Sequence, residues 1–141
     1  MTTNVDGYEY TELDLKIIAG IHKAVEDRGR DWVYPKFTEN EHGEEIWNED
    51  WTRSGSCLYV KDDLTPACIV GYALVEAGIP ARDMQVLEDA EELVRTYLSL
   101  DVSERMTLAL DRAQSVQDRG GSWGEAVDAF GNVLATGKYH S

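Results

Sequence analysis

The architecture depends on one run of residues, Pro66-Ala67-Cys68-Ile69-Val70-Gly71-Tyr72-Ala73-Leu74-Val75-Glu76-Ala77. It carries a single charge, at Glu76, and is apolar on nearly all sides. A helix of this composition is buried, so we expect it to be the central helix of the fold. Thr65 is the predicted N-cap, with Pro66 in the first helical position, and Gly78 ends the helix. Gly71 costs about 1 kcal/mol relative to Ala in a helix interior, which predicts that another backbone lies close to it.

Four further helices are predicted around this run, each opened by a capping residue and lined by apolar residues at helical spacing. They extend from Thr11 to Gly29, from Pro80 or Asp83 to Leu98, from Ser103 to Gly120, and from Ser122 to about Gly137. Thr11-Glu12-Leu13-Asp14 and Ser122-Trp123-Gly124-Glu125 match the capping box. The predicted inward faces are Leu13, Ile17, Ile21 and Ala24; Val86, Leu87, Ala90, Leu93, Val94, Tyr97 and Leu98; Met106, Ala109, Leu110, Ala113 and Val116; and Trp123, Ala126, Val127, Phe130, Val133 and Leu134.

Two short runs of β-branched and aromatic residues are typical of strands. Trp32-Val33-Tyr34 and Cys57-Leu58-Tyr59-Val60 are both bounded by turn-forming residues and are expected to pair as antiparallel strands. Ile46-Trp47 is a candidate third strand. The sequence therefore predicts an α+β fold that is mostly helical, with about five helices and a small two- or three-stranded antiparallel sheet.

Length and composition predict a single domain over residues 1–141, with residues 1–10 and 137–141 frayed at its ends. Hydrophobic residues make up 43% of the chain, as in globular proteins. Cys57 and Cys68 have neither CxxC spacing nor the density of a disulfide framework. The N-terminus lacks the features of a signal peptide, and the longest apolar run is far short of the roughly 20 residues of a membrane span. We expect a cytoplasmic protein that does not bind membranes.

The charge balance narrows the range of partners. Acidic residues outnumber basic ones by 27 to 13, giving a net charge of -14, and the excess is spread along the whole chain. Nucleic-acid affinity rests on clustered cationic side chains, so direct binding of DNA or RNA is disfavoured. The excess favours solubility, and it leaves open a basic protein partner or mimicry of a nucleic acid.

Two motifs carry a resemblance to known sequences. They are Pro66-Ala67-Cys68-Ile69-Val70-Gly71-Tyr72-Ala73-Leu74 with Gly78-Ile79-Pro80, and Ala113-Gln114, Gln117-Asp118 and Gly120 followed by Trp123-Gly124-Glu125-Ala126. Over about residues 57–130 the chain resembles small uncharacterised proteins of bacteriophages that infect actinobacteria, and related short actinobacterial proteins of unknown function. This resemblance implies a phage accessory gene, acting in the host cytoplasm. It implies no activity, cofactor or catalytic residue.

The candidate binding segment is the long connection at residues 35–56. It contains two tryptophans and six acids, whereas most loops in compact domains are much shorter, and long loops are commonly functional. Aromatic residues rimmed by carboxylates suit a contact with a basic protein partner. The alternative is that the aromatic residues of this region cover the sheet and the core. The residues predicted to bind the partner are Trp47, Trp51, Glu44, Glu45 and Glu49.

No catalytic constellation stands out. His22, His42 and His140 are isolated from any nucleophile motif, and no phosphate-binding glycine loop or EF-hand spacing is present. The leading hypothesis is a non-catalytic phage accessory protein that binds a host or phage protein and needs no cofactor or metal. A small carboxylate- or metal-dependent hydrolase is one alternative, and an acidic nucleic-acid mimic that inhibits a DNA-binding protein is another. The sequence leaves the oligomeric state open.

Overall fold

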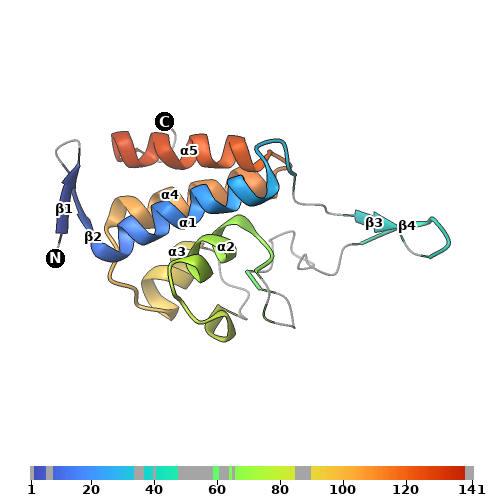
Figure 1. Ribbon diagram of the computed structural model, residues 1–141, viewed down its shortest axis with the longest axis horizontal. Coiled ribbons are helices and arrows are strands. Elements are labelled where there is room, and N and C mark those ends of the chain that lie inside the picture. Colours follow the sequence, from blue (N-terminus) through green and yellow to red (C-terminus); the bar gives the residue numbers. More distant parts are fainter. Residues whose placement is uncertain are drawn as a thin grey trace.

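The computed structural model describes residues 2–5, 8–33, 37–39, 41–47, 59–60, 64, 66–84 and 90–138. These residues are mostly helical, as predicted (Figure 1). The α-helices of this part are α1 (Glu12–Arg28), α2 (Ile69–Glu76), α3 (Ala90–Glu92), α4 (Glu104–Asp118) and α5 (Trp123–Thr136). A 3₁₀ turn, η1 (Ala81–Met84), follows α2, and α3 continues directly into a π-helical segment, η2 (Leu93–Tyr97).

The strands form two separate antiparallel hairpins. β1 (Thr2–Val5) pairs with β2 (Tyr8–Thr11), and β3 (Phe37–Glu39) pairs with β4 (Glu45–Trp47). β1 and β2 lie in a segment that the sequence predicts to be frayed. Tyr10 of β2 is nevertheless buried, and its hydroxyl donates to the Leu134 carbonyl of α5 at 3.4 Å. The hairpin is therefore fastened to the helical body through a residue of its second strand.

The predicted sheet between residues 32–34 and 57–60 is not supported. Val33 forms a single bridge to Ser122, and Val60 forms a single bridge to Pro66. The physical reason is that each backbone is already hydrogen-bonded elsewhere: the Trp123 N–H donates to the Trp32 carbonyl at 2.8 Å, and the Ala67 N–H donates to the Tyr59 carbonyl at 2.9 Å. The candidate third strand, Ile46-Trp47, is part of β4 and pairs with β3. Tyr34, Cys57 and Leu58 lie outside the described residues.

Helix α2 is central, as predicted, but it begins three residues later than expected. Its N-cap is Cys68, whose sulfur accepts from the Gly71 N–H at 3.5 Å, whereas Pro66 is held outside the helix by its bridge to Val60. Ile69, Val70, Gly71, Ala73 and Leu74 of the helix are buried, and Tyr72 is partly buried. The expected close approach at Gly71 is confirmed, because a Cβ there would lie 1.9 Å from the Tyr59 carbonyl oxygen.

Helix α1 packs along α2 and α5 (Figure 1). It starts with the predicted capping box between Thr11 and Asp14, and it ends at Gly29, whose φ of 94° is left-handed. α1 approaches α2 closely, since a Cβ at Gly20 would lie 2.5 Å from the Ala73 carbonyl oxygen. The missing side chain is what allows the two helices to lie against each other.

Helices α4 and α5 form an antiparallel hairpin that supplies much of the remaining core. Their N-caps are Ser103 and Ser122, as predicted, and the second is a complete capping box with Glu125. The inward faces of both helices are confirmed: most of the predicted residues are buried, and Val116 is partly buried. Gly137 ends α5 in the left-handed conformation. In the third predicted helix, Ala90, Leu93 and Val94 are buried, and Val86 and Leu87 lie outside the described residues.

Candidate functional site

The residues predicted to bind a partner lie in or beside the β3–β4 hairpin. Glu44 is exposed in the turn between the strands, and Glu45 and Trp47 belong to β4. In the backbone register of the strands, Glu45 is paired with Glu39 and Trp47 with Phe37. Figure 1 shows the hairpin away from the helices, at the opposite end of the molecule from β1. Glu49 and Trp51 lie outside the described residues.

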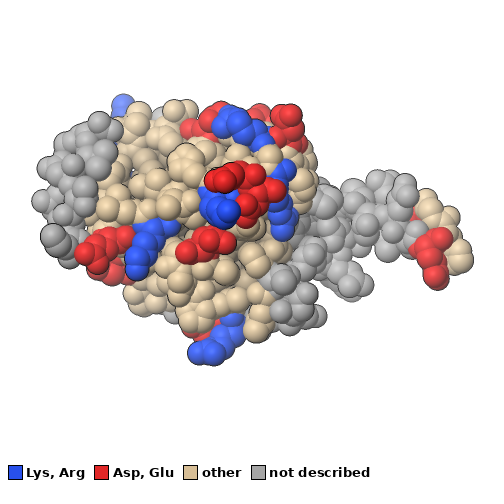
Figure 2. Space-filling view, in the orientation of Figure 1, with Lys and Arg blue, Asp and Glu red and all other residues tan. Residues whose placement is uncertain are grey.

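The turn of the hairpin is the most acidic described part of this segment. Glu41, His42, Gly43 and Glu44 are all exposed, and Gly43 adopts a φ of 77° that a residue without a side chain accommodates most easily. His42 Nε2 lies 3.7 Å from a carboxylate oxygen of Glu41. Figure 2 shows acidic side chains at this tip. From Phe37 to Trp47 the chain has no lysine or arginine, so a positive partner would meet no like charge from the hairpin.

A second group of side chains, which sequence reasoning missed, lies at the end of α1 and is buried or partly buried. The Arg28 guanidinium is 4.5 Å from the ring centroid of Trp32, 5.0 Å from that of Trp123 and 5.9 Å from that of Tyr72. The indoles of Trp32 and Trp123 meet edge to face with centroids 4.5 Å apart. Arginine over aromatic faces is a stabilising cation–π arrangement. We call these residues, Arg28, Trp32, Tyr72 and Trp123, the arginine–aromatic cluster.

The cluster continues into a chain of polar contacts on α1. The Tyr72 hydroxyl donates to Asp27, and Asp27 also pairs with Lys23 at 3.1 Å. Burial, together with the hydrogen bond to Asp27, raises the pKa of Tyr72 to about 12. The hydrogen bonds from Tyr72 and Lys23 hold the pKa of Asp27 below its ordinary value, and the pKa of Lys23 is raised mainly by Asp27. The network thus keeps Tyr72 neutral and Asp27 ionised near neutral pH.

The sequence motif of the resemblance has a structural role in this protein. Gln117, which is fully buried, accepts with Oε1 from the Ile69 N–H at 2.8 Å and from the Trp123 indole N–H at 3.0 Å. Gln114 accepts from the Ala90 N–H at 2.8 Å and donates to the Tyr59 hydroxyl at 3.0 Å. Polar groups of these kinds are costly to bury unless they are paired. Both glutamines therefore connect helices to neighbouring segments through hydrogen bonds. The motif that contains them has a role in packing.

The remaining candidates for chemistry are dispersed over the described residues. His22 and His42 are exposed in different parts of the molecule, and His140 lies outside the described range. Cys68 is a buried free thiol at the start of α2. In the part of the chain that the structure describes, no three histidine, cysteine or carboxylate side chains gather as a metal site would require. None of the helices there is long and apolar enough to cross a lipid bilayer.

The surface of the described residues contains two open clefts that are large enough for a small molecule. One, of about 300 Å³, lies between α1 and α2 and is lined by Lys16, Ala19, Gly20, Lys23 and Glu76. The other, of about 340 Å³, lies where η2 meets the start of α4 and is lined by Arg95, Leu100, Val102, Glu104 and Thr107. Neither cleft contains a residue that sequence reasoning selected for binding.

Comparisons of the chain with family profiles, with curated proteins and with solved structures find no match.

Proposed function

We infer that the protein is a non-catalytic binding protein whose acidic β3–β4 hairpin contacts a basic surface of a host or phage protein. The observation that supports this most is the position of the hairpin. It lies away from the helical body (Figure 1), and Glu41 and Glu44 in its turn are exposed. The phage setting rests on the resemblance of residues 57–130 alone.

The helical body supports the same function. Its most distinctive polar residues, Gln114 and Gln117, are engaged in hydrogen bonds between segments, and His22, the one histidine among the described residues of the body, is exposed. Carboxylates at an exposed turn increase the rate of encounter with a positive surface, and they disfavour partners of the same charge.

Affinity capture tests the proposal. Tagged wild-type protein, a Glu41→Lys/Glu44→Lys variant and a Glu26→Lys/Asp83→Lys control are used to retain proteins from actinobacterial lysates with and without phage infection. Both variants change the net charge equally, and Glu26 and Asp83 are exposed on the body. Like charges placed opposite each other cost several kcal/mol, so we expect the hairpin variant to bind at least about tenfold more weakly.

The supporting result is a protein with a basic surface that wild type and control retain and the hairpin variant loses. Equal retention by all three proteins would exclude the hairpin as the contact. Loss in both variants would show that total charge, and not the hairpin, determines binding.

A further inference from the structure

We propose that the cleft between η2 and the start of α4 is a binding site for a free α-amino acid with a branched aliphatic side chain. This site is independent of the hairpin and its partner. The cleft measures about 340 Å³, at the small end of the range for small-molecule sites. A cleft of this size admits a small organic ligand and is too small for a folded peptide.

The lining of the cleft combines a positive and a negative side chain with aliphatic side chains. Arg95 supplies a guanidinium and Glu104 a carboxylate, while Leu100 and Val102 supply aliphatic surface. A guanidinium has five N–H donors in a planar fork that fits a carboxylate. Only part of this capacity is used, since one nitrogen of Arg95 pairs with Glu91 at 3.3 Å and the Arg95 side chain is 50% exposed. A ligand complementary to this lining is a zwitterion with a short aliphatic side chain.

A small ligand that meets both charges of this lining must itself carry both charges. In a peptide the free ammonium and the free carboxylate belong to different residues, whereas a free α-amino acid carries both on one carbon. Arg95 would bind the carboxylate, and Glu104 would accept from the ammonium. The aliphatic side chain would lie against Leu100 and Val102, where burial contributes about 25 cal/mol per Å².

The wall of the cleft is fixed before any ligand binds. Leu98 and Leu100 donate their N–H groups to the carbonyls of Leu93 and Val94 at 2.8 and 3.0 Å. Further along the loop, the Ser103 N–H donates to the buried carboxylate of Asp14 at 3.0 Å. Thr107, also buried, is held by the Ser103 carbonyl at 3.3 Å. A site whose walls are already ordered loses less entropy on binding.

The other cleft supports a weaker case. Of its two lysines, Lys23 is already paired with Asp27, and its remaining lining of Lys16, Glu76, Ala19 and Gly20 includes no branched aliphatic side chain. A surface of that composition does not define a ligand class, so the proposal concerns the η2–α4 cleft alone.

The test is an NMR titration of the full chain with three probes. L-leucine carries both charges, 4-methylpentanoate lacks the ammonium, and 3-methylbutylamine lacks the carboxylate. We expect L-leucine to shift the amide resonances of the cleft residues saturably, with a Kd of about 1 mM or below. Each probe that lacks one charge should bind at least about tenfold more weakly, because charge-assisted hydrogen bonds contribute the difference.

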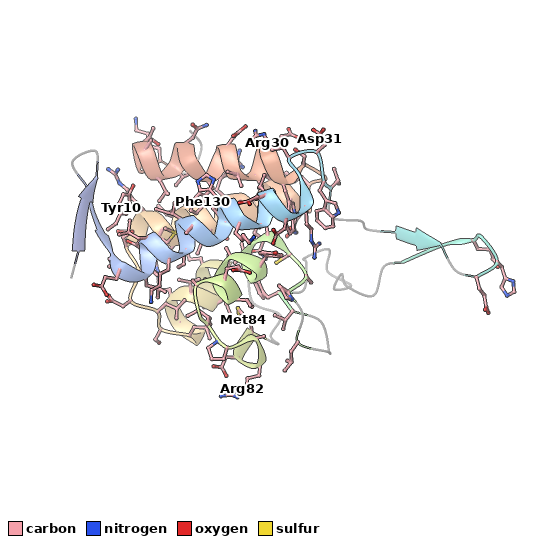
Figure 3. The ribbon with its side chains drawn as sticks, viewed as in Figure 1. Tyr10, Arg30, Asp31, Arg82, Met84 and Phe130 are labelled. Atoms are coloured by element: carbon pink, nitrogen blue, oxygen red, sulfur yellow. The ribbon has the colours of Figure 1, made fainter. Side chains whose placement is uncertain are left out.

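Variants assign the charges. In Arg95→Gln, L-leucine and 3-methylbutylamine should bind equally; in Glu104→Gln, L-leucine and 4-methylpentanoate should bind equally. Both side chains are exposed, so the fold should survive. Arg82→Gln is the control, because Arg82 is an exposed arginine of η1 outside the cleft lining (Figure 3). The proposal is overturned if no probe gives saturable shifts in these residues, or if the two cleft variants keep the wild-type order of affinities.

Discussion

The hydroxyl of Tyr72 is the described group whose ionisation the fold changes most clearly. Its pKa is raised to about 12, by burial first and by the hydrogen bond to Asp27 second. The unfolded chain releases the same proton near pH 10, so between these values the folded state binds more protons than the unfolded state. This contribution to stability is complete below about pH 10 and is lost as the pH rises through about 12.

Urea unfolding of wild type and Tyr72→Phe at about pH 9 and about pH 11 tests this prediction. Wild type should lose more stability between the two values than the variant, which has no proton to release. The raised pKa of the exposed Lys23 acts in the same direction, but it is present in both proteins. An equal loss in both proteins would show that Tyr72 does not titrate as its surroundings imply.

Individual residues also explain which part of the site could be predicted. The exposure of Glu44 follows from its place in a polar turn, and it was expected. The arginine–aromatic cluster was not, because Arg28, Tyr72 and Trp123 are far apart in the chain and meet only through the packing of three helices. Hydrophobic spacing predicts which face of a helix is buried, but it does not predict which distant side chain lies opposite.

The start of a helix could be predicted from the sequence where a hydroxyl side chain caps it. It could not be predicted where a contact with another segment sets the first helical residue. α1, α4 and α5 begin at Thr11, Ser103 and Ser122, whose hydroxyls bond to backbone N–H groups nearby in the sequence. α2 begins at a cysteine cap, because a bridge to Val60 draws Pro66 out of the helix. A backbone contact with the segment before the helix therefore shortened it, and backbone contacts with other segments replaced the predicted sheet.

The close contact of α2 with the backbone at Tyr59 gives a matched pair of glycine substitutions. Gly71→Ala places a Cβ 1.9 Å from the Tyr59 carbonyl oxygen, so we expect it to destabilise the fold by about 3 kcal/mol or more. Gly131→Ala, in the exposed middle of α5, meets nothing within 4 Å and should stabilise by about 0.5–1 kcal/mol through helix propensity. Thermal and urea unfolding measure both. A Gly71→Ala variant as stable as wild type would contradict the observed approach.

On the scale of the whole molecule, three helices meet at one amide. Gln117 of α4 accepts from the first backbone N–H of α2 and from the indole of Trp123 at the start of α5. Gln117→Leu keeps much of the volume but leaves two buried donors without their acceptor, and each such donor costs about 1–3 kcal/mol. We expect a total loss of about 2–5 kcal/mol in urea unfolding.

The control for this prediction is Arg119→Gln, an exposed change just beyond α4 that should stay within about 0.5 kcal/mol of wild type. Near-ultraviolet circular dichroism should also change in Gln117→Leu, because the Trp123 indole loses its partner. A fully stable Gln117→Leu variant with an unchanged tryptophan spectrum would show that the amide is dispensable.

The glycines at helix contacts have a consequence for tracing ancestry. A homologue could differ from this chain at nearly every surface position and keep the fold. It could not easily replace Gly20 or Gly71, because a Cβ at these positions would lie 2.5 and 1.9 Å from a backbone carbonyl oxygen. A search for homologues that requires glycine at these two positions, with a glutamine and a tryptophan at the positions of Gln117 and Trp123, would therefore be more selective than one based on surface residues.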